Sequence, residues 1–226
     1  MAASIVPKTV TAAEVAFMAG LTDREINRLV DENVLSAPLV QRDDGRRFAP
    51  LTACFADFYF SMSESLTRSA RIGIIDTLTQ RLLVRPDLDA FLTLSDSVLR
   101  GNFDWSVHLD VLTVALTRYV EVASQRAGRV SEAAQHVTED PQILGGMPCF
   151  AGTRVPVASV LAAKQQGMAL DELHAAWPFL TAELLDHAEV YMKAHPRPGR
   201  PRRLDEDASR MKLVSRKVVR HPREHA

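Results

Sequence analysis

Apolar residues in the first quarter of the chain recur every three or four positions and then alternate. This pattern predicts two helices followed by a β-hairpin. The first helix begins at Thr11, where Thr-Ala-Ala-Glu fits a capping box, and it ends at Gly20. A second capping box at Thr22 starts a helix with one apolar face. Asp-Asp-Gly at 43–45 separates two short alternating runs, as in a hairpin turn, so residues 9–50 have the order of a helix-turn-helix with a wing.

The middle of the chain, 61–136, carries apolar stripes that predict packed helices. One stripe consists of Leu66, Ala70, Ile74, Leu78 and Leu82, and another of Leu109, Leu112, Leu116 and Tyr119. A short strand is also expected near 105–109. Because buried helices show such stripes by default, we interpret this segment as a helical connector rather than a ligand site.

Residues 137–195 combine a glycine-rich extended arm with three helical segments. Gly145, Gly146 and Gly152 allow tight turns with positive φ, while nearby prolines and β-branched residues favour extended backbone. The expected helices span 157–166, 170–176 and 182–195. Two short helices and a longer third one make a second unit that is like a helix-turn-helix.

The predicted fold class is mainly α, in four parts. These are a winged helix-turn-helix at 1–60, a helical connector at 61–136, a β-arm with a three-helix, helix-turn-helix-like domain at 137–195, and a basic, disordered tail at 196–226. The tail has ten Lys and Arg against four Asp and Glu, whereas the rest of the chain has 17 against 24. A basic tail on an acidic body suits an acidic partner: nucleic acid, an acidic protein cleft, or the body itself.

Composition argues against several classes of protein. The chain has no run of 18 apolar residues that would span a membrane, and its first residues lack the pattern of a signal peptide. Cys54 and Cys149 are too few for a disulfide scaffold or a zinc site, and we expect two buried thiols. We therefore expect a cytoplasmic protein with no membrane partner.

Motifs of enzymes are weak in this sequence. His221-Pro222-Arg223-Glu224-His225 fits the His-x-x-Glu-His string of some zinc proteases, but that motif needs a helix in a folded cleft, and Pro222 interrupts it. No phosphate-binding loop, dinucleotide fingerprint or nucleophile elbow occurs. We expect no catalytic residue, no metal and no cofactor.

Basic and amide side chains of the first unit suit DNA, because phosphate contacts need cations and base readout needs Arg, Lys, Asn or Gln. The expected DNA-binding residues are Arg24, Asn27 and Arg28 on the second helix, Arg42, Arg46 and Arg47 on the wing, and Arg154 on the β-arm. The alternative for the first unit is a solvated helix face beside a charged hairpin. For Arg154 it is an ion pair that holds the arm in place.

The last helix of the second unit suits DNA poorly. It carries Glu183, Asp186 and Glu189 against only Lys193, and three carboxylates near a phosphate backbone are repulsive. We therefore expect 137–195 mainly to dimerise or to support the tail.

The first unit resembles the MerR-type winged helix-turn-helix over about 50 residues. The resemblance is carried by Thr9 to Ala16, Gly20-Leu21-Thr22, Ile26, Leu29, Leu35, Gly45-Arg46-Arg47-Phe48 and Pro50. It implies a DNA-binding protein.

The second unit resembles a family of small bacterial and archaeal domains of unknown function, many of which are described as VapB-type antitoxins. The matching residues are Asp140 to Gly146, Pro148, Ala151 to Val157, Gly167, Asp171-Glu172 and Pro178 to Thr181. Ala169 departs from the Ser or Thr that usually caps the second short helix. The resemblance implies an antitoxin that neutralises a PIN-like ribonuclease toxin and represses its own operon as a DNA-binding dimer.

The tail suits the carboxylate cluster that the resemblance implies for such a toxin. Its expected toxin-binding residues are Arg210, Lys212, Leu213, Arg216, Lys217 and Arg220. The alternative is an unstructured solubilising or non-specifically DNA-binding tail. Two rival functions remain, a stand-alone MerR-like transcription regulator whose middle helices sense a ligand, and an interaction adaptor that does not bind DNA.

Overall fold

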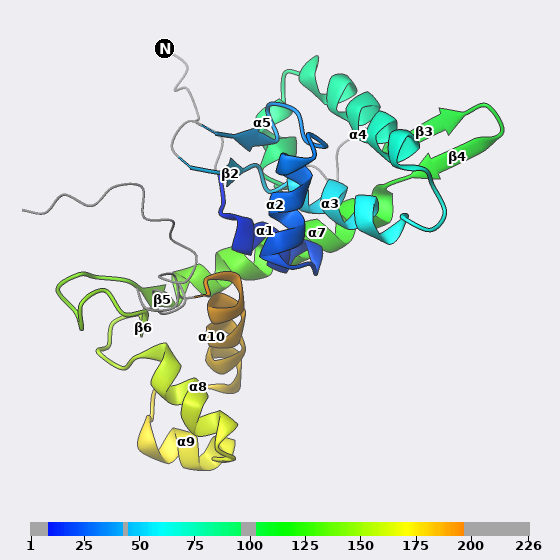
Figure 1. The fold of residues 1–226 in the computed structure, drawn as a ribbon. Helices are drawn as coiled ribbons and strands as arrows, with labels where there is room; N and C mark the ends of the chain where they lie inside the picture. Colours follow the sequence, from blue (N-terminus) through cyan, green and yellow to red (C-terminus); the bar gives the residue numbers. More distant parts are fainter. Residues whose placement is uncertain (1–8, 43–44, 96–102, 197–226) are drawn as a thin grey trace, which may run out of the picture. The chain divides into compact units, whose positions relative to one another are not determined.

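The computed structural model describes residues 9–42, 45–95 and 103–196 and confirms a mainly α fold (Figure 1). Its helices are α1 (Ala12–Ala19), α2 (Asp23–Asp31), α3 (Thr52–Ser61), α4 (Arg68–Leu83), α5 (Leu88–Leu92), α7 (Thr117–Gln135), α8 (Val157–Gln165), α9 (Leu170–Ala176) and α10 (Ala182–Ala194). Its strands are β1 (Val40–Gln41), β2 (Arg47–Phe48), β3 (Ser106–Leu109), β4 (Leu112–Ala115), β5 (Val137–Thr138) and β6 (Cys149–Phe150). No helix in these ranges is long and apolar enough to cross a membrane.

Both predicted capping boxes are present at the start of α1 and α2. The hydroxyl of Thr11 accepts from the backbone N–H of Glu14, and the Glu14 carboxylate accepts from the backbone N–H of Thr11 at 2.8 Å. Thr22 and Glu25 repeat this arrangement. These bonds satisfy backbone donors that a helix start leaves unpaired, and they explain why two helices form with only three residues between them.

Two features favour glycine at position 20, where α1 ends. Its φ of 73° lies in the left-handed region that favours glycine. In addition, a Cβ at this position would lie 2.7 Å from Nη1 of Arg126 on α7, which donates to the carbonyl of Met18 at 3.1 Å. The turn between α1 and α2 is therefore also a contact with α7.

The predicted wing is the antiparallel pair β1–β2, in which Val40 lies opposite Phe48. Phe48 is fully buried and also exchanges two backbone hydrogen bonds with Val10, ahead of α1. The base of the wing is thereby joined to the chain that enters the first helix.

The apolar stripe predicted for 109–119 is wrong in its first half. Leu109 and Leu112 lie opposite each other in the hairpin β3–β4, across a turn at Asp110 and Val111. A separation of three residues is produced by one helical turn and also by a two-residue hairpin turn, so the spacing misled the prediction. The strand expected near 105–109 is confirmed as β3.

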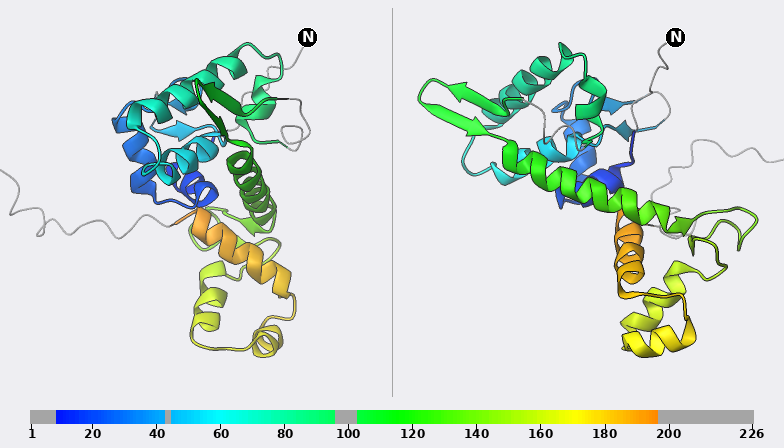
Figure 2. Two further views of the ribbon diagram at one scale, coloured as in Figure 1. Left: turned by 90° about the vertical axis from the view of Figure 1, so that its right-hand side faces the viewer. Right: turned by 180° about the vertical axis from the view of Figure 1, so that it is seen from behind.

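Helix α7 packs against α1, α3 and α10, and both views of Figure 2 show these helices beside it. It buries Val120, Ala123, Val130 and Ala133 along this face. The buried side chains of the described elements, from Val10 to Ala194, form one continuous hydrophobic core. The predicted domain boundaries remain predictions.

The glycine-rich arm forms the antiparallel pair β5–β6, with Val137 opposite Phe150. Gly145, Gly146 and Gly152 all adopt positive φ, as predicted. The three helices expected after the arm are α8, α9 and α10, and they begin and end within about one residue of the expected positions. The thiols of Cys54 and Cys149 are free and buried, as predicted.

The end of α10 is joined to the start of α1 by an ion pair. Nε2 of His195 lies 3.4 Å from Oε1 of Glu14, and Nδ1 of His195 lies 3.0 Å from the carbonyl oxygen of Tyr191. Both neighbours of the ring are acceptors, so only the protonated imidazolium can donate to both. The hydrogen bond to Glu14 raises the pKa of His195 against the opposing effect of burial. Burial opposes ionisation of Glu14, but hydrogen bonds from His195 and Thr11 outweigh it and lower the pKa of Glu14.

Ala169 precedes α9 and leaves its capping box half formed. Its backbone N–H donates to Glu172 at 2.8 Å, but alanine has no side-chain acceptor to complete the box. Ala169→Ser should raise the free energy of unfolding by about 0.5–1 kcal/mol, measured by urea denaturation. Ala175→Ser, at an exposed position inside the same helix, is the matched control and should have no effect or destabilise slightly. Equal effects of the two substitutions would contradict the capping account.

His195→Gln should lower the free energy of unfolding by about 1 kcal/mol near pH 6 and by much less near pH 9. The pKa of His195 is raised in the folded state, so its stabilisation is fully present below the ordinary histidine pKa and disappears as the pH rises through the folded-state pKa. Glu14, whose pKa is lowered, is ionised at both pH values. Urea denaturation at the two pH values measures the difference. His108→Gln, at an exposed position of β3, is the control, and an equal loss from His195→Gln at both pH values would refute the ion pair.

Candidate nucleic-acid interface

Helix α2 presents Arg24 from its first turn. The side chain is exposed, and it makes no hydrogen bond or ion pair within the part of the chain that the structure describes. Buried Ile26, Leu29 and Val30 fix which face of α2 turns outward. Arg24 is therefore a cation that is positioned by a packed helix and is free to meet an anion.

Arg46 of the wing clamps the wing to α2. Its Nη1 donates to Oδ1 of Asn27 at 3.0 Å, and its Nη2 donates to Oδ1 of Asp31 at 2.6 Å. Nδ2 of Asn27 in turn donates to the carbonyl of Asp23 at 2.9 Å. Asn27 and Asp31 lie one turn apart on the helix, so their acceptors match the two arms of one guanidinium.

Two further wing arginines bond to backbone carbonyls. Nη2 of Arg42 lies 3.4 Å from the carbonyl oxygen of Val30, near the end of α2, and Nη2 of Arg47 lies 3.2 Å from that of Thr9. The carbonyl of Val30 also accepts from the backbone N–H of Asn33 at 3.1 Å, and its second lone pair can accept from Arg42. The three wing arginines therefore all attach the wing to neighbouring chain segments.

Arg28 pairs along its own helix. Its Nε donates to Oε1 of Glu32 at 2.6 Å, and Nε of Arg68 lies 3.6 Å from the other oxygen of Glu32. The hydrogen bond from Arg28 lowers the pKa of Glu32 and raises that of Arg28. The Arg28 side chain is still 62% exposed, and exposed pairs of this kind add little to stability, so the pair can exchange partners.

Arg154 lies in the loop between β6 and α8. It is exposed and makes no ion pair with any described residue, so the alternative that it holds the arm through a carboxylate is not seen there. Thr153 and Val155 shape the turn instead, since the Thr153 hydroxyl accepts from the backbone N–H of Val155 and donates to the carbonyl of Phe150. Within the described ranges, no hydrogen bond or ion pair joins Arg154 to the six DNA-binding residues expected in the first unit, which are Arg24, Asn27, Arg28, Arg42, Arg46 and Arg47.

The carboxylates of α10 have partners that the sequence did not reveal. Asp186 lies 2.9 Å from Nη2 of Arg129 on α7. Glu189 lies 2.5 Å from Nζ of Lys164 on α8 and 3.6 Å from Lys193. Glu183 is exposed and has no ion pair with a described residue. Two of the three acidic side chains therefore hold α10 against its neighbours.

The expected toxin-binding residues, Arg210, Lys212, Leu213, Arg216, Lys217 and Arg220, lie outside the described residues. So does the His-x-x-Glu-His string at 221–225.

Sequence reasoning missed Asp31, Glu32 and Thr9 as partners of the basic residues. The pairing of Arg28 with Glu32 could have been predicted from the sequence, because these residues have the four-residue spacing of a helical ion pair. The contacts from Arg46 to α2 join positions 15 and 19 residues apart and depend on how the wing folds back.

One protein family matches part of this chain, and a relative matches most of it. Residues 137–192 match the family described as "Protein of unknown function (DUF433)". This confirms the expected assignment of the second unit to a domain family of unknown function. The crystal structure of Rv2018 from Mycobacterium tuberculosis aligns with 80% of this chain and 97% of that chain, at 16% identity and a TM-score of 0.30. That likeness is too low to carry an argument.

A relative covers most of this chain. The "Uncharacterized protein y4eO" of Sinorhizobium fredii (strain NBRC 101917 / NGR234) is 34% identical over 197 residues, which are 87% of this chain and 86% of the relative. The chain therefore belongs to the same family as this rhizobial protein, and its residues 137–192 match the DUF433 family.

Proposed function

We propose that this protein is the antitoxin of a type II toxin–antitoxin system, which represses its own operon by binding operator DNA and neutralises a PIN-like ribonuclease toxin. The observation that carries the DNA-binding part is the exposed, unpaired Arg24 on a helix that follows a tight turn and precedes a clamped wing. A helix-turn-helix places its second helix in the major groove, where arginine is the commonest reader of guanine.

The internal bonds of the other basic residues support this proposal. Arg46, Arg42 and Arg47 hold the wing at a set position beside α2, and a preformed surface loses less entropy when DNA binds. The bonds are exposed and weak, so phosphates can displace Asp31 from Arg46 or Glu32 from Arg28. In this proposal, these arginines hold the interface in position before DNA binds and then contact the phosphates of the DNA backbone.

The antitoxin part rests on the DUF433 domain, on the VapB-type and MerR-type resemblances of the sequence, and on the basic tail. A metal-binding cluster of carboxylates in a ribonuclease would attract a segment with ten basic residues. We further propose a homodimer in the cytoplasm, because helix-turn-helix proteins read two half-sites one helical turn apart.

The rival functions differ in which partners they need. A stand-alone MerR-like regulator would bind the promoter without a toxin, and an interaction adaptor would bind a protein without DNA. Co-expression with the product of the neighbouring small gene separates the antitoxin from both.

Arg24→Ala should weaken binding to the promoter upstream of the gene by about fivefold to a hundredfold, because a guanidinium contact to a base contributes about 1–3 kcal/mol. Electrophoretic mobility shifts at two salt concentrations measure this loss. Arg118→Ala removes another exposed arginine, at the start of α7, that has no hydrogen bond or ion pair among the described residues. This control should keep full affinity. Unchanged binding in the double variant Arg24→Ala/Arg28→Ala would refute the DNA interface.

Truncation after His195 should abolish neutralisation of the co-expressed toxin while leaving promoter binding in place, since the helix-turn-helix is retained. Growth after toxin induction and co-purification of the toxin measure the loss. Alanine at Arg210, Lys212, Arg216, Lys217 and Arg220 should reproduce it, whereas alanine at Arg197, Arg200, Arg202 and Arg203 should not. Full neutralisation by the truncated chain would remove the tail from the proposal.

A further inference from the structure

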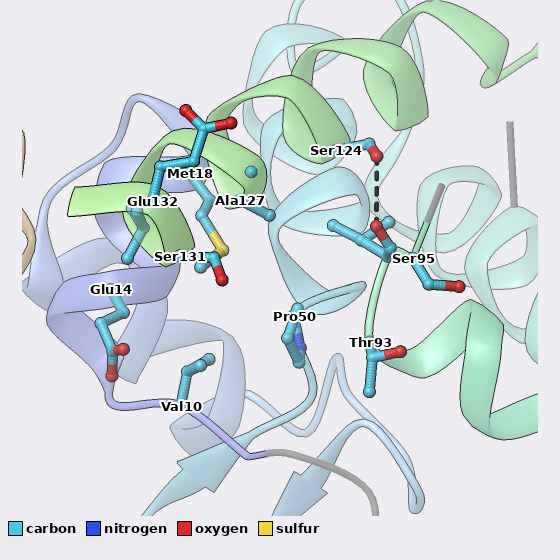
Figure 3. A pocket seen from close by; sticks show the side chains of 13 residues that line it. Val10, Glu14, Met18, Pro50, Thr93, Ser95, Ser124, Ala127, Ser131 and Glu132 are labelled. Carbon is cyan, nitrogen blue, oxygen red and sulfur yellow. Dashed lines mark hydrogen bonds between the residues drawn. The ribbon is translucent and has the colours of Figure 1, made fainter. Parts of the chain in front are cut away.

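A cavity of about 410 Å³ lies between the first helix of the helix-turn-helix and α7 (Figure 3). Its walls come from α1, from Pro50 after the wing, from the segment that follows α5, and from one face of α7. This volume falls in the range of roughly 300–1,000 Å³ that is typical of small-molecule sites. The cavity is separate from the exposed face of α2.

Apolar and polar side chains both line the cavity. Met18, Pro50 and Ala127 lie around it in Figure 3, and Ser131 also lines it. The hydroxyl of Ser124 donates to the carbonyl of Leu94 at 3.2 Å and so closes one wall. Such a mixed lining suits a small molecule that has both an apolar body and a polar group.

Among the described residues, the charged side chains that line the cavity are both carboxylates. Glu14 and Glu132 lie on the same side of the cavity in Figure 3, opposite Thr93 and Ser95. Glu14 already accepts from Thr11 and pairs with His195, whereas Glu132 makes no ion pair with a described residue. Of the two carboxylates, Glu132 is therefore the one without an ionic partner among the described residues.

Gly128 leaves open space where α7 faces the cavity. A Cβ at this position would meet no atom within 4 Å, so no close packing requires a glycine. Glycine inside a helix costs about 1 kcal/mol relative to alanine. Gly128 thus offers a position where a side chain can fill the cavity without strain.

We propose that this cavity binds a small organic amine, with its apolar body between Met18, Pro50 and Ala127 and its ammonium group toward Glu132. Apolar walls account for affinity, and the carboxylate selects a cation over an isosteric alcohol or acid. The site is independent of the DNA and toxin proposals. Because Glu14 caps α1, an occupant also contacts the base of the helix-turn-helix.

The test uses three probes of one shape, 2-phenylethylamine, 2-phenylethanol and phenylacetate, titrated into the full-length chain at concentrations up to about 10 mM. Backbone amide shifts in nitrogen-15 NMR spectra give the dissociation constants. We expect the amine to bind more tightly than the alcohol and the acid to bind most weakly. Glu132→Gln should weaken the amine up to about fivefold, as an exposed ion pair does, and leave the alcohol unchanged.

Gly128→Leu should weaken the amine and the alcohol at least tenfold, because the leucine occupies their place. Gly73→Leu is the matched control, since Gly73 is an exposed glycine within α4 at which a Cβ also meets no atom within 4 Å. Both variants should fold, because leucine favours a helix more than glycine does. Equal binding of amine and acid, unchanged binding in Gly128→Leu, or no shift with any probe would overturn the proposal.

Discussion

The packing of one helix, α7, constrains the rest of the structure. Its 19 residues extend for about 28 Å, and along this length it meets α1, α3 and α10. The buried side chains on these helices belong to the same continuous core. Helices α1 and α3 in the first part of the chain and α10 near its end therefore share an apolar support, and a change in α7 reaches all three.

Polar contacts reinforce this packing at the two ends of α1. Arg126 of α7 bonds to the carbonyl of Met18 where α1 ends, and Glu14 joins the start of α1 to His195 at the end of α10. Glu14 also completes a capping box. One carboxylate therefore caps a helix, forms an ion pair and lines a cavity. Contacts that are shared in this way make the position of α1 depend on segments far along the chain.

Most basic residues of the first unit form bonds inside the protein that hold its local structure. Each wing arginine bonds inside the protein, and Arg28 bonds along α2, which leaves Arg24 free among these residues. An exposed guanidinium that is held by a weak bond costs little to release. Under the proposed function, such a surface is positioned for DNA and remains able to exchange its internal partners for phosphates.

The sequence by itself determined the local features of this protein. Capping boxes at Thr11 and Thr22, the glycine turns of the arm and the three helices that follow it depend on residues within a few positions of one another, and all could be read correctly. Leu109 and Leu112 were misread because helix and hairpin share their spacing. Only the tertiary structure decided that Arg46 bonds to Asn27 and Asp31, that Asp186 bonds to Arg129, and that residues of α1 and α7 line a common cavity. These features join residues distant in sequence, and their geometry depends on how whole helices pack, which local propensity does not encode.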